Sequence, residues 1–248
     1  MSGIALVTGG SRGIGAATAC KLSLHGYSVV LTYTHDSFSA EEVVRAITAA
    51  GGKAQALQMD ISCEAQVLDV FEKLDQQVEP LTLLVNNAGI TEGFCRLEAL
   101  SLEQLQRVFQ VNVFGVFMCA REAVKRMGRS NGGTGGSIIN VSSRAAQVGG
   151  GGEWIHYAAT KGAIDSLTYG LAKEVADDGI RVNAVAPGLI ETELHATAGW
   201  PDRAAMLATI VPMQRAGYPE EVADCIAWLA SSAATYVTGA VVPVSGGR

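Results

Sequence analysis

Short apolar runs alternate along the chain with longer segments in which apolar residues recur at helical spacing. Most of these runs are rich in Val, Ile and Leu and are followed by glycine or small polar residues, which is typical of strands buried on both faces. Strands that alternate with helices form a parallel sheet with helices on both faces. The predicted strands are Ile4–Thr8, Ser28–Tyr33, a segment ending at Met59, Leu83–Asn86, Ile138–Ser143, Arg181–Ala186 and Val241–Val244.

Polar residues at the start of the helical segments indicate where helices begin. Ser39-Ala40-Glu41-Glu42 and Ser101-Leu102-Glu103-Gln104 each fit a capping box, in which two side chains satisfy backbone N–H groups reciprocally. A further helix is expected from Ser62. The chain has 248 residues and no linker, charge run or internal repeat that would divide it. We therefore predict an α/β fold, a single doubly wound Rossmann-type domain over residues 1–248.

Composition and charge narrow the functional classes. The formal net charge is −6 and the pI is about 5.2, so we expect no nucleic-acid partner. No apolar stretch approaches the roughly 20 residues that span a membrane, and the first strand begins too close to Met1 for a signal peptide. The five cysteines are odd in number and form no C-x-x-C pair, which predicts buried thiols rather than disulfides or a metal site. We expect a cytoplasmic protein without membrane contact.

A glycine-rich turn follows the first predicted strand. Its residues, Gly9-Gly10-Ser11-Arg12-Gly13-Ile14-Gly15, stand between that strand and a helical pattern. Glycine allows a ligand to approach the backbone N–H groups of a helix N-terminus, which bind the pyrophosphate of a dinucleotide. The spacing is G-x-x-x-G-x-G rather than the common G-x-G-x-x-G. Such a turn can also serve only to tighten a strand-to-helix connection.

Tyr157 and Lys161 stand four residues apart in a helical segment and therefore share one face of the helix. Tyrosine titrates near pH 10, and its use as a proton shuttle requires a pKa lower by roughly two to three units. An ammonium about 4 Å away, at an effective dielectric near 20, supplies roughly the 3 to 4 kcal/mol that this shift requires. We expect Lys161 to lower the pKa of Tyr157. Taken alone, the pair also fits a chance arrangement on a solvated face.

Four motifs occur in one order along the chain. Thr8–Gly15 (TGGSRGIG) is followed by Asn86–Gly89 (NNAG), by a serine at a strand end, and by the Tyr-x-x-x-Lys pair. With these motifs in this order the chain resembles the short-chain dehydrogenase/reductase family from Ile4 to the terminal Ser245-Gly246-Gly247. The resemblance implies hydride exchange between a nicotinamide cofactor and a secondary alcohol or ketone.

The same resemblance implies the catalytic roles. Tyr157 would exchange the substrate hydroxyl proton, and Lys161 would lower its pKa and hold the cofactor ribose. Ser143 would donate to the substrate oxygen, and Asn112 would anchor a water that replaces the proton, although a lone buried asparagine is often only a packing or kink residue. Ser143 lies fourteen residues before Tyr157, about one more than the family usually has. We place the extra residue in the Gly149–Gly152 loop.

Cofactor identity depends on the end of the second strand, where an acidic residue would bind the ribose of NAD and repel a 2′-phosphate. That position is Tyr33, while Arg12 resembles a basic position of NADPH-preferring members. We therefore expect NADP, with NAD as the less favoured cofactor. Asp36 either turns back to a ribose or opens the loop before the next helix. The resemblance implies cofactor contacts from Gly9, Ser11, Arg12, Gly13, Ile14, Gly15, Tyr33, Thr34, His35, Asp60, Ile61, Asn87, Ala88, Gly89, Tyr157, Lys161, Pro187, Gly188, Ile190 and Thr192.

Two aromatic residues near the catalytic tyrosine have no motif. His156 is adjacent to Tyr157 and points about 100° away from it on a helix, so we interpret it as a pocket or surface histidine. Trp154, in the glycine-rich loop before the helix, is expected to line the substrate pocket.

The substrate is the least determined inference. β-Ketoacyl-ACP reductases resemble the chain over Ala186–Thr192 and Ile226–Ser231, and sugar or polyol dehydrogenases resemble it about as well. Acyl carrier protein is acidic, yet acidic residues crowd the end of the active helix (Glu174, Asp177 and Asp178), and the positive patch is small (Arg126 and Arg129). We favour a small free carbonyl compound. The alternatives are β-ketoacyl-ACP reduction and, in a different class, a non-catalytic NADP-binding sensor or scaffold.

The helices after Ser101 and around Tyr157 contain more apolar residues than one buried face requires, which is typical of partner surface. By family resemblance these helices would pair in a homotetramer. The residues in question are Val113, Phe114, Val116, Phe117, Ile164, Leu167 and Leu171.

Overall fold

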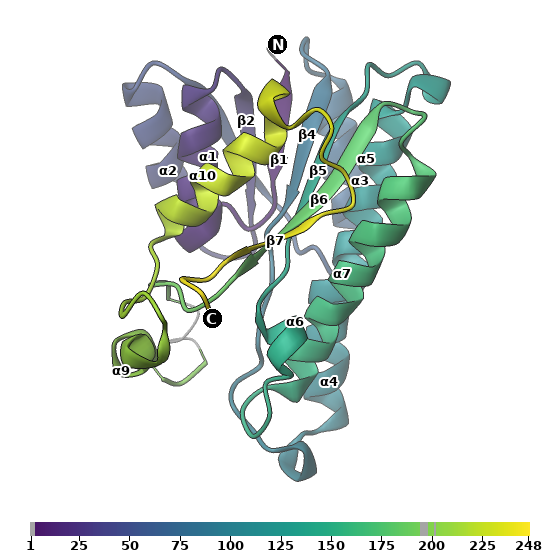
Figure 1. Ribbon diagram of the computed structural model, residues 1–248. Coiled ribbons are helices and arrows are strands. Elements are labelled where there is room, and N and C mark those ends of the chain that lie inside the picture. Colours follow the sequence, from purple (N-terminus) through teal and green to yellow (C-terminus); the bar gives the residue numbers. More distant parts are fainter. Residues whose placement is uncertain (1–2, 194–197, 201) are drawn as a thin grey trace.

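The computed structural model describes residues 3–193, 198–200 and 202–248. At its centre is a seven-stranded sheet with the order β3-β2-β1-β4-β5-β6-β7 and parallel pairing throughout (Figure 1). This order confirms the predicted doubly wound Rossmann-type fold. The strands are β1 Ile4–Val7, β2 Ser28–Tyr33, β3 Lys53–Gln58, β4 Leu81–Asn86, β5 Gly136–Val141, β6 Ile180–Pro187 and β7 Val241–Val244.

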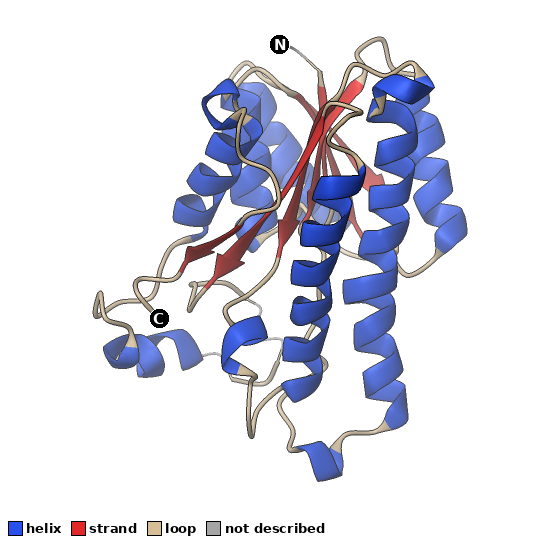
Figure 2. Ribbon diagram, turned by 45° about the vertical axis from the view of Figure 1, so that its right-hand side comes forward, coloured by secondary structure: helices blue, strands red, loops and turns tan. Residues whose placement is uncertain are grey.

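Helices cover both faces of the sheet (Figures 1 and 2). One face carries α1 Gly13–Leu24, α2 Ser37–Ala49 and α10 Pro219–Ala230, and the other carries α3 Glu64–Asp75, α5 Val116–Met127 and α7 Ile155–Glu174. A π-helical segment, Gln110–Gly115, joins α4 Leu102–Phe109 to α5. The short helices α6 Ala145–Val148 and α9 Arg203–Leu207 lie beyond the carboxyl ends of the strands.

Two hydrophobic cores lie on the two faces of the sheet, because successive strand residues point to opposite faces. In β1, Ile4 and Leu6 belong to the core beneath α3 and α5, which contains the fully buried Phe71. Ala5 and Val7 belong to the core beneath α1 and α10. A strand that packs on both sides needs apolar residues at every position, which explains the continuous apolar runs in the sequence.

Helix starts agree with the sequence only in part. The capping box at Ser101 is confirmed. The backbone N–H of Gln104 donates to the Ser101 hydroxyl over 3.1 Å, and the Oε1 of Gln104 accepts from the Ser101 backbone N–H over 3.1 Å. The predicted box at Ser39 is wrong, because α2 begins at Ser37 with Asp36 as its N-cap. The Asp36 carboxylate accepts from Ser39 N at 3.0 Å and from its hydroxyl at 2.6 Å. An aspartate one turn earlier therefore replaces the serine as the cap.

Three further expectations from the sequence concern a helix start, the cysteines and membrane-spanning helices. The helix predicted from Ser62 begins at Glu64, because Ser62 donates its N–H and hydroxyl to Asp60. Cys119 is fully buried, whereas Cys20, Cys63, Cys95 and Cys225 are half-buried. Across the described ranges no helix combines the length and the apolar character needed to cross a membrane.

The apolar surplus on the long helices is smaller than the sequence indicates. Val113, Val116 and Ile164 are buried inside the protein and cannot serve as partner surface. Phe114 and Phe117 remain about half exposed, at 52% and 48%. The apolar patch on this side therefore rests on a few aromatic side chains.

Candidate active site

A cavity of about 860 Å³ lies beyond the carboxyl ends of the strands, where a doubly wound sheet binds its ligands. The turn after β1, the ends of β2, β4 and β5, and the start of α7 all contribute to its wall. Every residue predicted to bind the cofactor or to act in catalysis lines this cavity, except Gly15 and Asn112. The sheet therefore brings the four separate motifs to one place.

The glycine turn after β1 is closely packed. Gly9 and Gly13 adopt positive φ angles of 63° and 51°, which a side chain would strain. Gly15 does not touch the cavity, and a Cβ placed on it would overlap the Gly9 carbonyl oxygen and the Asn87 amide. Gly15 is thus required for packing beneath the turn rather than for ligand contact.

Asn87 and Thr8 hold this turn in place. The Asn87 amide donates to the carbonyl oxygens of Thr8 and Gly9, over 2.9 and 2.8 Å. The Thr8 hydroxyl accepts from the backbone N–H groups of Asn87 and Ala88, over 3.0 and 3.1 Å. Asn87 lines the cavity as predicted, but its amide supports the turn between β1 and α1.

The N-terminus of α1 faces the cavity without a side-chain cap. Arg12, at the N-cap position, is extended and makes no capping hydrogen bond, and the first turn contains no acidic residue. Gly13 and Ile14 line the cavity beside it. Uncapped N–H groups and the positive end of the helix dipole together favour an anion at this point.

At the end of β2, Tyr33, Thr34 and His35 line the cavity together with Arg12. Asp36 also reaches it, but the carboxylate caps α2. The hydrogen bonds from Ser39 lower the pKa of Asp36, and the charge of Arg12 contributes a smaller share of that effect. Arg12 is therefore within electrostatic reach of the end of β2.

The other predicted cofactor residues line further parts of the cavity wall. Asp60 accepts two hydrogen bonds from Ser62 and lies 3.7 Å from Arg107. Thr192 packs on the glycine turn, where a Cβ on Gly13 would lie 3.3 Å from its methyl group. The further wall residues from this set are Ile61, Pro187, Gly188 and Ile190.

Tyr157 and Lys161 lie on the first turns of α7, both almost completely buried. Burial raises the pKa of Tyr157 to about 12, and a hydrogen bond with Ser143 opposes this rise. The expected lowering by Lys161 is thus wrong for this arrangement. The Lys161 ammonium donates to the Val141 carbonyl at 2.7 Å and lies 5.5 Å from the centre of the tyrosine ring. Burial lowers the pKa of Lys161 itself to about 8.

The two serines at the end of β5 point in different directions. Ser143 lies close enough to the Tyr157 phenol to oppose the rise of its pKa, and its hydroxyl accepts from the Ala145 N–H at 3.1 Å. Ser142 donates instead to the buried carboxylate of Asp165, whose other oxygen accepts from Gln147 at 3.0 Å. Burial raises the pKa of Asp165. Sequence reasoning missed Asp165, although it stands one turn after Lys161 in α7.

Asn112 lies in the π-helical segment and is fully buried. Its oxygen accepts from the Ile90 N–H at 2.8 Å, and its amide donates to the Ile90 carbonyl at 2.8 Å and to Thr160 at 3.1 Å. A Cβ on Gly89 would lie 3.3 Å from the Asn112 oxygen and 3.6 Å from the Lys161 ammonium. Asn112 therefore sits behind the cavity wall and joins the segment after β4 to α7.

A cluster of aromatic side chains from distant segments lies at the other end of the cavity. Trp154 lines it, as expected, and stacks on Phe94 at 4.6 Å between ring centres. Trp154 also lies 5.3 Å from the Tyr157 ring, and Trp200 meets Phe94 edge-on at 5.7 Å. Arg203 lies against this cluster. No local motif marks Phe94, Trp200 or Arg203, so sequence reasoning missed them.

His156 has a structural position rather than the expected place in the pocket or on the surface. It is buried, and its Nε2 donates to the Thr91 carbonyl at 2.6 Å. The ring thus ties the start of α7 to the segment after β4.

Comparison with known proteins agrees with this geometry. The family model described as enoyl-(acyl carrier protein) reductase matches residues 9–248. The chain belongs to the short-chain dehydrogenase/reductase family. Among curated members, an uncharacterized oxidoreductase of Escherichia coli K12 is 55% identical over 245 residues, 99% of each chain.

Two solved structures of this family superpose closely on the protein. A short-chain dehydrogenase/reductase from Serratia marcescens is 36% identical and covers 99% of this chain and 97% of its own, with a TM-score of 0.90. A blue fluorescent protein from a metagenomic library, in complex with NADPH, is 34% identical over the same shares, with a TM-score of 0.89. The protein is therefore an oxidoreductase of the short-chain dehydrogenase/reductase type.

Proposed function

We propose that the protein transfers a hydride between NADP(H) and a secondary alcohol or ketone, and that it reduces a small free carbonyl compound. The observation that carries this proposal is one continuous cavity that joins the uncapped N-terminus of α1 to Tyr157. The residues fit a dinucleotide, because glycine backbone and uncapped N–H groups face the cavity where a pyrophosphate would lie. When bound, the nicotinamide supplies or accepts the hydride.

The catalytic side chains suit proton donation to a carbonyl oxygen. With a pKa raised to about 12, the Tyr157 phenol stays protonated at neutral pH and holds the proton that reduction requires. Ser143, bonded to that phenol, would donate to the same oxygen as negative charge develops on it. Lys161 has a pKa of about 8 and therefore keeps most of its positive charge at neutral pH. Its ammonium would stabilise the negative charge that develops on the substrate oxygen.

Three observations support NADP over NAD. No carboxylate ends β2, where Tyr33 stands, and the nearby Asp36 is engaged as the cap of α2. Arg12 offers a guanidinium, which suits a 2′-phosphate. A structural relative carries NADPH.

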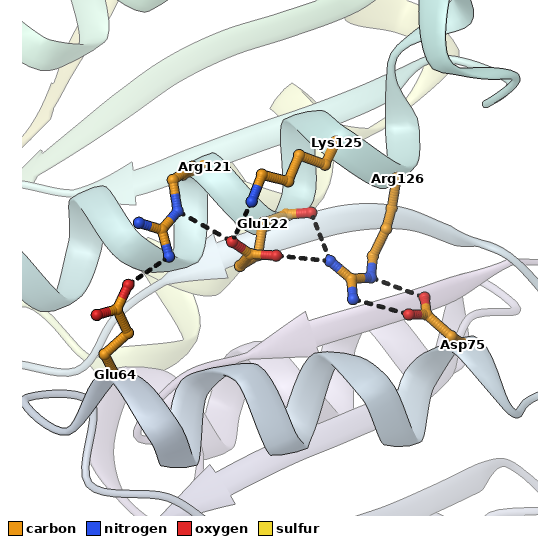
Figure 3. Close-up of polar contacts among 6 residues, drawn as sticks. All are labelled: Glu64, Asp75, Arg121, Glu122, Lys125 and Arg126. Atoms are coloured by element: carbon orange, nitrogen blue, oxygen red, sulfur yellow. Dashed lines mark hydrogen bonds and ion pairs between the residues drawn. The ribbon is translucent and has the colours of Figure 1, made fainter.

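The surface favours a small substrate over an acyl carrier protein. Of the two arginines of the small positive patch, Arg126 is already paired with Glu122 and makes a two-pronged contact with Asp75, both bonds 2.7 Å long (Figure 3). Asp178 accepts from the backbone N–H of Ser130 beside Arg129. An acidic partner would meet a patch that is largely neutralised. β-Ketoacyl-ACP reduction remains the second candidate because a 3-oxoacyl-[acyl-carrier-protein] reductase of Synechocystis is 39% identical to the chain over 245 residues.

We further propose a cytoplasmic homotetramer. The half-exposed Phe114, Phe117 and Tyr169 support pairing through the π-helical segment, α5 and α7. The mass of the protein in solution at micromolar concentration tests this assembly, and a monomer would contradict it.

The test of function is a panel of ketones, aldoses and β-ketoacyl thioesters, assayed with NADPH and NADH by absorbance of the reduced nicotinamide. We expect turnover of a free ketone and a loss of at least about a hundredfold in kcat for Tyr157→Phe, with NADPH affinity unchanged. A variant that keeps more than about one tenth of kcat, a loss below about 1.4 kcal/mol, contradicts the role of Tyr157. NADPH binding without any turnover would favour the sensor or scaffold.

A further inference from the structure

A buried arginine lines the substrate end of the cavity and plays no part in the proposed chemistry. Arg203, at the start of α9, has a side chain only 4% exposed. One terminal nitrogen pairs with Glu153, whose side chain is 35% exposed. The Nε of Arg203 is buried and has no hydrogen-bond partner among the described residues. A guanidinium has five N–H donors, so this one pair leaves most of its hydrogen-bonding capacity unused.

Three aromatic rings hold this guanidinium. Its central carbon lies 4.7 Å from the ring of Trp154, 5.5 Å from Phe94 and 5.8 Å from Trp200. Cation–π contacts attract the positive charge without using the N–H groups as hydrogen-bond donors, which leaves these groups for a ligand. Because Trp154 also touches the ring of Tyr157, a single indole separates the positive charge from the catalytic phenol.

A purely structural role accounts poorly for these observations. An arginine that only tied α9 to the loop before α7 would have Nε satisfied, because an orphaned buried N–H costs about 1 to 3 kcal/mol. Glu153 is partly in water, so its attraction for Arg203 is screened and a ligand carboxylate can compete with it. A carboxylate that enters the cavity would supply the two acceptor oxygens that suit a guanidinium edge.

We propose that Arg203 binds the carboxylate of a substrate that is a keto acid, with its carbonyl at Tyr157 and its apolar body against Trp154. The inference rests on the proposed function and assigns its substrate class. The intervening indole requires the carbonyl and the carboxylate to be separated by a ring or a short chain rather than to be adjacent. A carboxylate fits better than a phosphate, because the aromatic wall presents a single cation.

The kinetic test uses a matched pair of substrates, 4-oxocyclohexanecarboxylate and its methyl ester, with NADPH. We expect wild type to prefer the acid by at least about tenfold in kcat/KM, which corresponds to about 1.4 kcal/mol. Arg203→Met should remove the preference by slowing the acid and sparing the ester, and Arg203→Lys should retain part of it. Arg45→Met is the control, because Arg45 has the same kinds of partner, Glu42 and the ring of Phe38, on the surface of α2; it should leave the ratio unchanged.

A binding test separates this inference from the proposed function. Cyclohexanecarboxylate and cyclohexanecarboxamide are titrated against the tryptophan fluorescence of Trp228→Phe, which removes the signal of α10 and serves as the background for the other variants. We expect saturable quenching by the carboxylate alone, loss of it in Arg203→Met, and tighter binding in Glu153→Gln, because the competing carboxylate is gone. Equal kcat/KM for acid and ester, or an unchanged response in Arg203→Met, overturns the anion site and leaves the reductase. Carboxylate binding that requires Arg203, without turnover of any ketone, overturns the reductase and leaves the anion site.

Discussion

The cofactor end and the substrate end of the cavity differ in the groups that form their walls. At the cofactor end the wall includes the glycine turn, residues 9–14, and the uncapped start of α1, where backbone N–H groups face the cavity. At the substrate end the wall includes the side chains of Trp154 and Arg203, which come from distant segments and pack against Phe94. A backbone site tolerates little change and suits a ligand common to a whole family. A side-chain site can be replaced residue by residue without altering the fold, which is how one fold serves many substrates.

Lys161 lies where the two ends meet and gives the largest expected effect. Burial lowers the pKa of its ammonium from 10.5 to about 8. Between these values Lys161 binds more protons in the unfolded chain than in the folded protein, so its contribution to stability rises with pH, by roughly 1.4 kcal/mol per pH unit and roughly 3 kcal/mol in all. The buried thiol of Cys119, whose pKa is also raised, contributes in the opposite direction, so the Lys161 contribution is taken as the difference between wild type and Lys161→Met. Urea unfolding midpoints from pH 7.5 to 9.5, below the range in which Tyr157 titrates, measure this rise.

Lys161→Met should abolish the rise and make the protein more stable than wild type at pH 7.5. Lys73→Met removes an exposed lysine paired with Asp69 and should follow the wild-type curve. A parallel slope in Lys161→Met and wild type would contradict the buried ammonium. Either result shows whether burial of the Lys161 ammonium destabilises the folded protein.

How far the sequence predicts this structure depends on the range over which each feature is encoded. The strand positions and the capping box at Ser101 are local and are confirmed. The start of α2 fails because Asp36 and Ser39 are both good caps, and only the path of the chain after β2 selects between them. The direction of the Lys161 ammonium, toward Val141, depends on where β5 ends relative to α7. The aromatic cluster around Arg203 requires the complete tertiary fold.

At the cofactor end, the side chain of Arg12 is predicted to select NADP over NAD. If Arg12 meets a 2′-phosphate, Arg12→Ala should weaken NADP binding by about 1.5 to 3 kcal/mol, roughly ten- to a hundredfold, and leave NAD nearly unchanged. Tyr33→Asp should then improve NAD by adding a ribose acceptor and reject NADP by repulsion. Titration of both cofactors against the two variants measures these effects. Equal weakening of both cofactors in Arg12→Ala would mean that the arginine only shapes the turn.

A pair of glycine substitutions compares the two ends directly. In Gly15→Ala the new methyl group would overlap backbone and the Asn87 amide, so we expect a loss of about 1 to 3 kcal/mol in stability and weaker NADPH binding. Gly151, in the loop before Trp154, has no positive φ, and a Cβ placed on it would meet nothing within 4 Å among the described residues. Gly151→Ala should leave both properties within about 0.5 kcal/mol of wild type. Thermal unfolding and NADPH fluorescence measure them, and similar losses in both variants would remove the proposed contrast.

The smallest expected effect concerns Asp36, which lines the cofactor end of the cavity and also caps α2. Its carboxylate caps α2 through Ser39, so Asp36→Ala should cost about 1 kcal/mol of stability, within the usual range for a lost N-cap. A residue that serves only as a cap contributes nothing to NAD affinity, and Asp36→Ser, which keeps a capping oxygen, should restore most of the stability. Chemical denaturation and NAD titration of both variants measure the two quantities separately. A drop in NAD affinity in Asp36→Ala with little change in stability would instead make Asp36 the ribose acceptor, and the cofactor end would then depend on side chains as much as the substrate end does.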